Sequence, residues 1–298
     1  MLGDKRLLPA KKAIITLASV MPSNHYHECM GISKRHDKIY FSANGKALYA
    51  VDITHPQATC ITTIAEVTRP WNDEYGDTFL HDLKCANDGM IYAAAEDRIL
   101  MIDPVSGRYE TPVKDGFSGA WGSYGLALDD AGNILVGDHD GGVFFYQKSR
   151  NWKKHVLLQP SMTSMGQLAS FGGVELAEGG NVLYALDFKN SLLYSGSVTW
   201  DAEGVPTLTA VKSLRLPLVY PEFMQIWNGD VFIKAARDNS MVRVRNHEVI
   251  QEISFESDET VSPIVTFVLD PQDLDRAVFY GTSWGPDGTL FRGELAFR

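Results

Sequence analysis

The chain has 298 residues, of which 45% are hydrophobic and 21% charged, a balance typical of a soluble globular protein with a large core. Its formal net charge is −10, with 37 acidic against 27 basic residues, so we do not expect nucleic acid as a partner. No window of about 18 consecutive apolar residues occurs, so no membrane-spanning helix is expected either.

Two features near the N-terminus bear on cellular location. The apolar run Ala13–Val20 follows several basic residues, but it is short and no clear cleavage site precedes Asn24, so we interpret it as a strand and not as a signal peptide. Cys29, Cys60 and Cys85 are odd in number and lack the CxxC spacing of zinc sites. These patterns predict reduced cysteines and a cytoplasmic protein.

A repeating unit of three strands and two turns is clearest in the middle of the chain. The strand Tyr124–Leu128 is followed by the polar turn Asp129–Asn133 and the strand Ile134–Gly137. A second turn, Asp138–Gly142, then leads to the strand Val143–Tyr146. Short apolar runs between Gly, Asp and Asn are typical of strands joined by hairpins.

The same unit recurs at starts about 40 to 50 residues apart, the period of propeller blades. The other five units begin near Glu28, His81, Gly172, Glu222 and Ile264. We therefore predict an all-β fold, one six-bladed β-propeller of four-stranded blades over residues 1–298. The remaining strand, Ala13–Ala18, is expected to close the ring by pairing with the last blade. The alternative is a pair of β-sandwich domains, which the lack of any linker-like stretch disfavours.

The start of each inner strand is predicted to face the central axis. One set of residues lies four places before the central apolar residue of its strand, namely Glu28, His81, Tyr124, Gly172, Glu222 and Ile264. Packing alone does not call for two carboxylates, an imidazole and a phenol at corresponding positions, since burying an unpaired charge is costly. We therefore predict Glu28, His81, Tyr124 and Glu222 as catalytic residues, although any one of them could simply bond the backbone of a neighbouring blade.

A second ring is expected from the hairpins on the same face, and aromatic residues gather at the strand entrances. From the hairpins come Asn44, Glu96, His139, Asp187, Arg237 and Trp284, where His139 also suits an ordinary turn. The predicted substrate-binding residues are Tyr26, Phe79, Trp121, His139, Phe171, Asp187, Phe223 and Trp284. Such a surface suits an apolar or aromatic small molecule.

Several stretches resemble the SMP-30/gluconolactonase/luciferin-regenerating superfamily and, more distantly, the strictosidine-synthase-like propellers. Glu28–Ile32 followed by Ile39–Phe41 is similar to the first blade of that superfamily, and Phe171–Leu176 followed by Leu183–Asp187 to its fourth. Pro221–Ile226 matches a later blade that carries an Asp. The resemblance implies a six-bladed propeller.

The resemblance also implies a metal site. In that superfamily a Glu, an Asp and two Asn residues surround a divalent metal, and Glu28 and Glu222 stand at the two acidic positions. Tyr124 and Gly172 stand at the Asn positions, which departs from the pattern.

Three functions remain open from the sequence. One is a lactone hydrolase in which Glu28 and Glu222 hold Ca²⁺, Mg²⁺, Mn²⁺ or Zn²⁺ that polarises a carbonyl. The second is a cyclase or isomerase of specialised metabolism with no metal, in which His81 and a glutamate move a proton and Tyr124 donates to an oxyanion. The loss of the Asn ligands and the aromatic rim favour this function, and the metal-free chemistry of the strictosidine-synthase-like relatives makes it reasonable. The third is a protein-binding propeller without catalysis.

Overall fold

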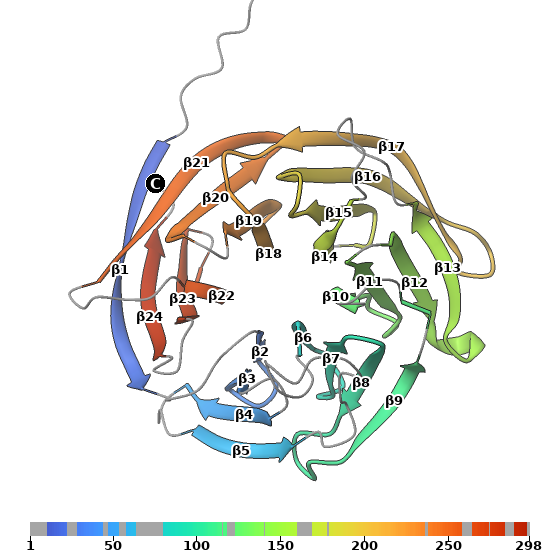
Figure 1. Ribbon diagram of the computed structural model, residues 1–298, viewed down its shortest axis with the longest axis horizontal. Helices are drawn as coiled ribbons and strands as arrows, with labels where there is room; N and C mark the ends of the chain where they lie inside the picture. Colours follow the sequence, from blue (N-terminus) through green and yellow to red (C-terminus); the bar gives the residue numbers. More distant parts are fainter. Residues whose placement is uncertain are drawn as a thin grey trace, which may run out of the picture.

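The computed structural model describes residues 11–22, 29–43, 47–53, 58–63, 80–114, 116–117, 123–139, 141–159, 169–177, 179–235, 238–257, 264–273, 275–283 and 289–296. Within these ranges the chain forms strands almost throughout, with one short 3₁₀ helix at Lys148–Arg150. The strands form six blades around an axis, so the six-bladed propeller predicted from the repeats is confirmed (Figure 1).

Each blade runs from an inner strand at the axis to an outer strand at the rim. Blade 1 contains β2 (Met30–Ser33), β3 (Lys38–Ala43), β4 (Ala47–Asp52) and β5 (Ala58–Thr63); blade 2 contains β6 (Asp82–Cys85), β7 (Ile91–Ala95), β8 (Arg98–Ile102) and β9 (Tyr109–Lys114); blade 3 contains β10 (Ser123–Leu128), β11 (Ile134–Asp138), β12 (Val143–Gln147) and β13 (Lys153–Leu158). Blade 4 contains β14 (Phe171–Leu176), β15 (Val182–Asp187), β16 (Leu192–Trp200) and β17 (Pro206–Arg215); blade 5 contains β18 (Pro221–Trp227), β19 (Asp230–Ala235), β20 (Ser240–Arg245) and β21 (Glu248–Ser257); blade 6 contains β22 (Ile264–Pro271), β23 (Arg276–Ser283), β24 (Thr289–Ala296) and β1 (Lys11–Pro22).

The strand β1 closes the ring and also joins two blades. Ala18–Pro22 pairs antiparallel with β24, as the outer strand of blade 6. Lys11–Leu17 pairs parallel with β21 of blade 5, so that blades 5 and 6 form one eight-stranded sheet (Figure 1). Closure by an N-terminal strand is confirmed. The prediction that Ala13–Ala18 pairs with the last blade is wrong for all but Ala18, because those residues continue along blade 5.

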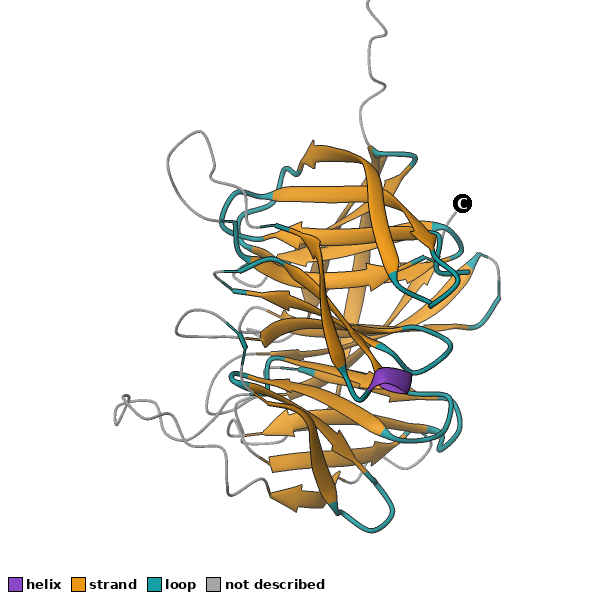
Figure 2. Cartoon of the chain, turned by 90° about the vertical axis from the view of Figure 1, so that its right-hand side faces the viewer, coloured by secondary structure: helices purple, strands orange, loops and turns teal. Residues whose placement is uncertain are grey.

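The hydrophobic core lies between neighbouring blades. The described residues form six apolar clusters, one for each of the six interfaces between blades. Figure 2, which turns the ring on its side, shows the blades stacked with their flat faces together. Because successive side chains of a strand point to opposite faces, each blade presents one apolar face to each neighbour. This arrangement leaves the edges of the inner strands facing the axis.

Four inner strands carry an irregularity at the same place. The pairing of each with its second strand slips by one residue at Tyr124, Gly172, Glu222 and Val265. Such a β-bulge sets two residues opposite one and redirects the extra side chain away from strict alternation. The predicted axis ring falls on these bulges in blades 3, 4 and 5. In blade 6 the prediction is wrong by one residue. The sequence pattern assigns Ile264 to the ring, whereas the bulge of β22 lies at Val265.

No helix of the described residues is both long and apolar enough to cross a membrane.

Candidate functional site

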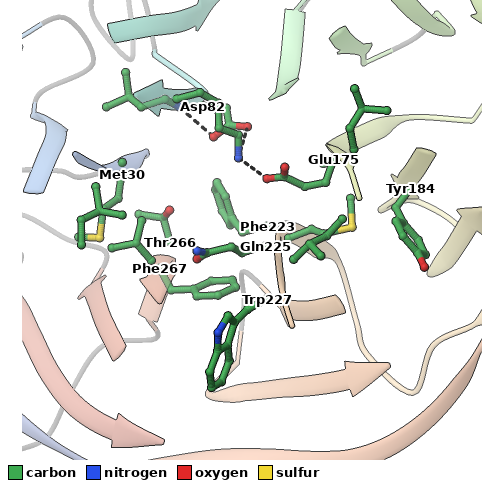
Figure 3. A pocket seen from close by; sticks show the side chains of 18 of the residues that line it. Met30, Asp82, Glu175, Tyr184, Phe223, Gln225, Trp227, Thr266 and Phe267 are labelled. Carbon is green, nitrogen blue, oxygen red and sulfur yellow. Dashed lines mark hydrogen bonds and ion pairs between the residues drawn. The ribbon is translucent and has the colours of Figure 1, made fainter. Parts of the chain in front are cut away.

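A cavity of about 640 Å³ lies on the axis of the propeller (Figure 3). All six inner strands contribute to its wall, although β10 does so only through Leu128. The wall is divided about evenly between polar and apolar surface, and Asp82, Lys84, Glu175 and Glu222 line it. A concave apolar pocket with a few convergent charged groups is the usual form of a small-molecule site.

The strand register identifies one level of the wall. The residues at this level are Gly31, Lys84, Ala127, Glu175, Gln225 and Val268, whose partners on the second strands are Tyr40, Tyr92, Leu135, Tyr184, Phe232 and Tyr280. On blade 3 this position is Ala127, which is buried between blades 3 and 4 and does not line the cavity. The long side chains of Lys84 and Glu175 therefore meet across blade 3.

Lys84 and two carboxylates form an ion cluster inside the cavity. The Lys84 Nζ lies 2.5 Å from Glu175 Oε1 and 3.6 Å from Asp82 Oδ2. Asp82 also accepts hydrogen bonds from the backbone N–H groups of Leu83, at 2.8 Å, and Leu126, at 2.9 Å. The cluster thus ties blades 2, 3 and 4 together at the axis.

Burial and charge act in opposite directions within this cluster. Burial raises the pKa of Asp82 and of Glu175, and the nearby ammonium of Lys84 offsets part of this increase. Burial alone would lower the pKa of Lys84, but the two carboxylates outweigh it and raise that pKa. Lys84 therefore stays protonated, and its ammonium group interacts with both carboxyl groups.

Gln225 holds blade 5 against blade 6. Its Oε1 accepts a hydrogen bond from the Leu269 N–H at 2.7 Å, and its Nε2 donates to the Leu269 carbonyl at 3.1 Å. Both ends of the side-chain amide are therefore engaged with one backbone position. Gln225 is a structural link that also forms part of the cavity wall.

An aromatic cluster gathers at the starts of the inner strands, on blades 2, 3 and 4. The Tyr124 ring stacks on His81, with ring centroids 4.5 Å apart, and on Phe188, at 5.5 Å. His139 packs against Tyr124 at 5.8 Å and against Phe188 at 5.3 Å. Tyr220 extends the cluster from Phe188 toward blade 5 at 6.5 Å. Side chains that the sequence pattern predicted in two separate rings, His81 and Tyr124 in one and His139 in the other, thus meet in one cluster.

Glu222 occupies the bulge of β18 and lines the cavity. Lys234, on β19, is fully buried behind it and donates hydrogen bonds to the carbonyl groups of Ala235 and Asp238. Burial lowers the pKa of Lys234 to about 7, although the charges of Asp238 and Glu222 raise it in part. The lysine that interacts with Glu222 therefore changes its protonation state near neutral pH.

The other described candidates have different surroundings. Phe223 lines the cavity, whereas Phe171 is fully buried in the apolar cluster between blades 3 and 4. The Asp187 carboxylate accepts hydrogen bonds from the backbone of Ser170, at 3.2 Å, and the side chain of Asn190, at 2.7 Å. His81 and Tyr124 are not among the residues that line the cavity. The remaining candidates lie outside the described residues, namely Glu28, Tyr26, Phe79, Trp121, Trp284, Asn44 and Arg237.

Sequence reasoning missed the cavity residues Asp82, Lys84, Glu175 and Gln225 as well as Phe188 of the aromatic cluster. A signal was present, since Asp82 and Lys84 alternate on one face of a strand whose neighbours are apolar. The sequence-based prediction rested on the strand entrances, where the bulges lie, and therefore left out these residues further along the inner strands.

The described residues contain no group of three or more His, Cys, Asp or Glu side chains placed to hold a metal ion. Glu28, which the resemblance pairs with Glu222 as a ligand, lies outside those residues.

Comparison with solved structures shows the fold. A luciferin-regenerating enzyme is 12% identical in sequence, with a TM-score of 0.66 over 95% of this chain and 97% of its own. Regucalcin from Agrobacterium tumefaciens, a calcium-binding protein, is 12% identical with a TM-score of 0.64 over 96% and 97% of the two chains. A catalytically inactive virginiamycin B lyase from Staphylococcus aureus, solved with quinupristin, is 9% identical with a TM-score of 0.61 over 94% and 98%.

No protein-family model and no curated protein matches the sequence. At these identities the likeness establishes the propeller architecture, while the chemistry must be argued from the residues themselves.

Proposed function

We propose that this protein is an enzyme that binds an apolar or aromatic small molecule at the propeller axis and isomerises or cyclises it by acid–base chemistry that needs no metal. The observation that carries the proposal is the cluster of His81, Tyr124 and His139, which lies outside the cavity lining but is joined to it through Asp82, the residue that follows His81 in the chain. Packing alone explains an aromatic cluster, but two imidazoles and a phenol are also groups that can move a proton.

The roles follow from the chemistry of the groups. Histidine is the side chain that titrates near neutrality unaided, so His81 suits proton transfer to or from the substrate. Tyr124 offers a hydroxyl that can donate to a developing oxyanion. The aromatic faces and the apolar wall would hold the substrate in one folded conformation, and such positioning lowers a barrier by up to about 7–11 kcal/mol.

The bulge positions support a mechanism without a metal. The resemblance places two metal-binding Asn residues at Tyr124 and Gly172. Here the ring of Tyr124 is packed between His81 and Phe188, and Gly172 has no side chain. A Cβ added to Gly172 would lie 3.0 Å from the Phe188 ring, so Phe188 takes part of the space that a ligand side chain would need.

The first prediction tests the role of His81. With the substrate identified, His81→Ala should slow turnover by about 10²–10⁴-fold, the usual contribution of general acid–base catalysis. His155→Ala, on the outer strand β13, is the matched control and should leave the rate unchanged. A chelator should have no effect. Steady-state kinetics of the two variants, with and without EDTA, make the comparison, and an unchanged rate in His81→Ala would contradict the proposal.

A divalent-metal lactone hydrolase is the second candidate, because Glu222 lines the cavity at a position that the resemblance assigns to a ligand. It requires stoichiometric metal in the purified protein and hydrolysis of simple lactones that EDTA abolishes and added metal restores. It also requires Glu222→Gln to lose the metal. Elemental analysis of wild type and Glu222→Gln therefore separates the two candidates without knowledge of the natural substrate.

A further inference from the structure

Among the described residues, acidic side chains outnumber basic ones in the wall of the axial cavity. Among the described residues that line it, three side chains are carboxylic acids and one is a lysine, namely Asp82, Glu175, Glu222 and Lys84. The ammonium of Lys84 is already engaged with Glu175 at 2.5 Å and with Asp82 at 3.6 Å. Lys234 stands behind Glu222 and does not line the cavity. When the carboxyl groups are ionised, the described residues of the wall therefore include more negative than positive side chains.

Aromatic side chains form another part of the same wall. Phe223 and Trp227 lie on β18 with Gln225 between them in the sequence, so all three point to the same face of that strand. Figure 3 shows Trp227 and Phe267 on the opposite side of the view from Asp82 and Glu175, with Phe223 between them. Aromatic faces attract cations through the negative electrostatic potential of the ring.

We propose that the occupant of this cavity is an organic cation, such as a protonated amine, whose charged group lies against Glu175 and Glu222 and whose apolar body packs on Phe223 and Trp227. This inference rests on the proposed function, which places a small molecule at the axis, and it assigns that molecule its charge. The excess carboxylate would pair with the ligand cation, and the aromatic wall would enclose the rest of it.

Anionic and neutral occupants use the wall less well. An anion would have to compete with Glu175 for Lys84, and a displaced carboxylate in a partly buried site is costly. A neutral apolar molecule would fill the cavity but would leave the carboxylates without any added partner. Burial also raises the pKa of Asp82 and Glu175, and a bound cation would lower both values.

Three probes of similar size and different charge test the inference. Benzylamine, benzyl alcohol and benzoate are titrated into the full-length protein by calorimetry near neutral pH. Benzylamine should bind about 10- to 100-fold more tightly than benzyl alcohol, the range expected for a hydrogen bond to a charged group. Benzoate should bind more weakly than the alcohol. Quenching of tryptophan fluorescence that Trp227→Phe removes would place the probe in the cavity.

Two variants identify the responsible groups. Glu175→Gln should weaken benzylamine binding about tenfold and leave benzyl alcohol binding unchanged. Because this variant leaves Lys84 with one carboxylate fewer, thermal melting must confirm that it folds. Glu222→Gln provides a second test that leaves the Lys84 pair intact, and it should act in the same direction. Glu110→Gln, on the outer strand β9, removes an exposed carboxylate far from the axis and is the control.

The outcomes separate this inference from the proposed function. Equal affinity for benzylamine and benzyl alcohol, or unchanged benzylamine affinity in both Glu175→Gln and Glu222→Gln, overturns the inference and leaves a neutral small-molecule site in place. Tighter binding of benzoate overturns it and assigns the recognition to Lys84. If none of the probes binds at millimolar concentration, the proposed small-molecule function is contradicted together with the inference.

Discussion

Lys234 is a lysine whose charged group lies in the protein interior. It is fully buried on β19, and its ammonium donates hydrogen bonds to two backbone carbonyl groups, those of Ala235 and Asp238. The Phe255 ring centroid lies 5.7 Å from its Nζ, and the charged groups that act on it are Asp238 and Glu222. Burial outweighs these charges and lowers the pKa of Lys234 from 10.5 to about 7.

This environment predicts a stability that changes with pH. Between the folded pKa of about 7 and the unfolded value of 10.5, the unfolded chain binds more protons at this site than the folded chain. The free energy of unfolding should therefore rise with pH above neutrality. Urea unfolding at pH 7, 8 and 9 should show this rise in the wild type and a smaller rise in Lys234→Met. An identical pH dependence in the two proteins would mean that another group titrates.

At the scale of single elements, glycines let two inner strands approach closely. Gly125 on β10 faces Gly172 and Gly173 on β14, and a Cβ added to Gly125 would lie 2.7 Å from the Gly172 carbonyl oxygen. Gly137 on β11 has the same relation to Phe171, with its carbonyl oxygen also at 2.7 Å. Real Cβ atoms do not approach backbone this closely, so blades 3 and 4 depend on glycine at these positions. This close packing also fixes the start of β10, where Tyr124 stands.

Gly125→Ala should therefore destabilise the protein by at least about 1–3 kcal/mol, the cost of overpacking a well-packed interior. Gly31→Ala, on the inner strand β2, is the matched comparison, because its added Cβ would lie no closer than 3.3 Å to Cys85 Sγ. Its effect should be clearly smaller. Chemical denaturation of the two variants measures the difference. A Gly125→Ala protein as stable as Gly31→Ala would mean that the two strands can separate at little cost.

At the scale of the whole molecule, one strand holds the ring closed. The first residues of β1 pair with the outer strand of blade 5, and its last residues pair with the outer strand of blade 6. Without β1, blade 6 would have three strands and the sheet would separate into two parts. Both β21 and β24 would then expose unpaired backbone edges, which are prone to aggregate.

Deletion of residues 1–22 should accordingly abolish soluble, cooperatively folded protein. Deletion of residues 1–10, which leaves β1 whole, is the control and should melt as the full chain does. Size-exclusion chromatography and thermal melting distinguish the two proteins. A monomeric 1–22 deletion with a cooperative transition would show that the interfaces between blades suffice to close the ring.

Much of the fold could be read from local patterns. Each blade is built from strands that are neighbours in sequence, so alternation of apolar residues and turns such as Asn228-Gly229, both with positive φ, indicates the hairpins directly. One error arose where the partner is distant in sequence, because the parallel pairing of β1 with β21 depends on contacts that no local pattern encodes. The other error, the one-residue offset in β22, lies within the β22–β23 hairpin, where the sequence pattern did not reveal the position of the bulge.

The candidate site divides in the same way. The sequence by itself determined the six-bladed repeat and the residue types at the strand entrances, because strand periodicity and turn chemistry are local properties. Only the tertiary structure decided that His81, Tyr124 and His139 meet in one cluster, and that Lys84 reaches Glu175 across blade 3. The physical reason is that bulges and glycine contacts between blades set the direction and spacing of these side chains. The glycine contacts in particular depend on how blades 3 and 4 pack against each other.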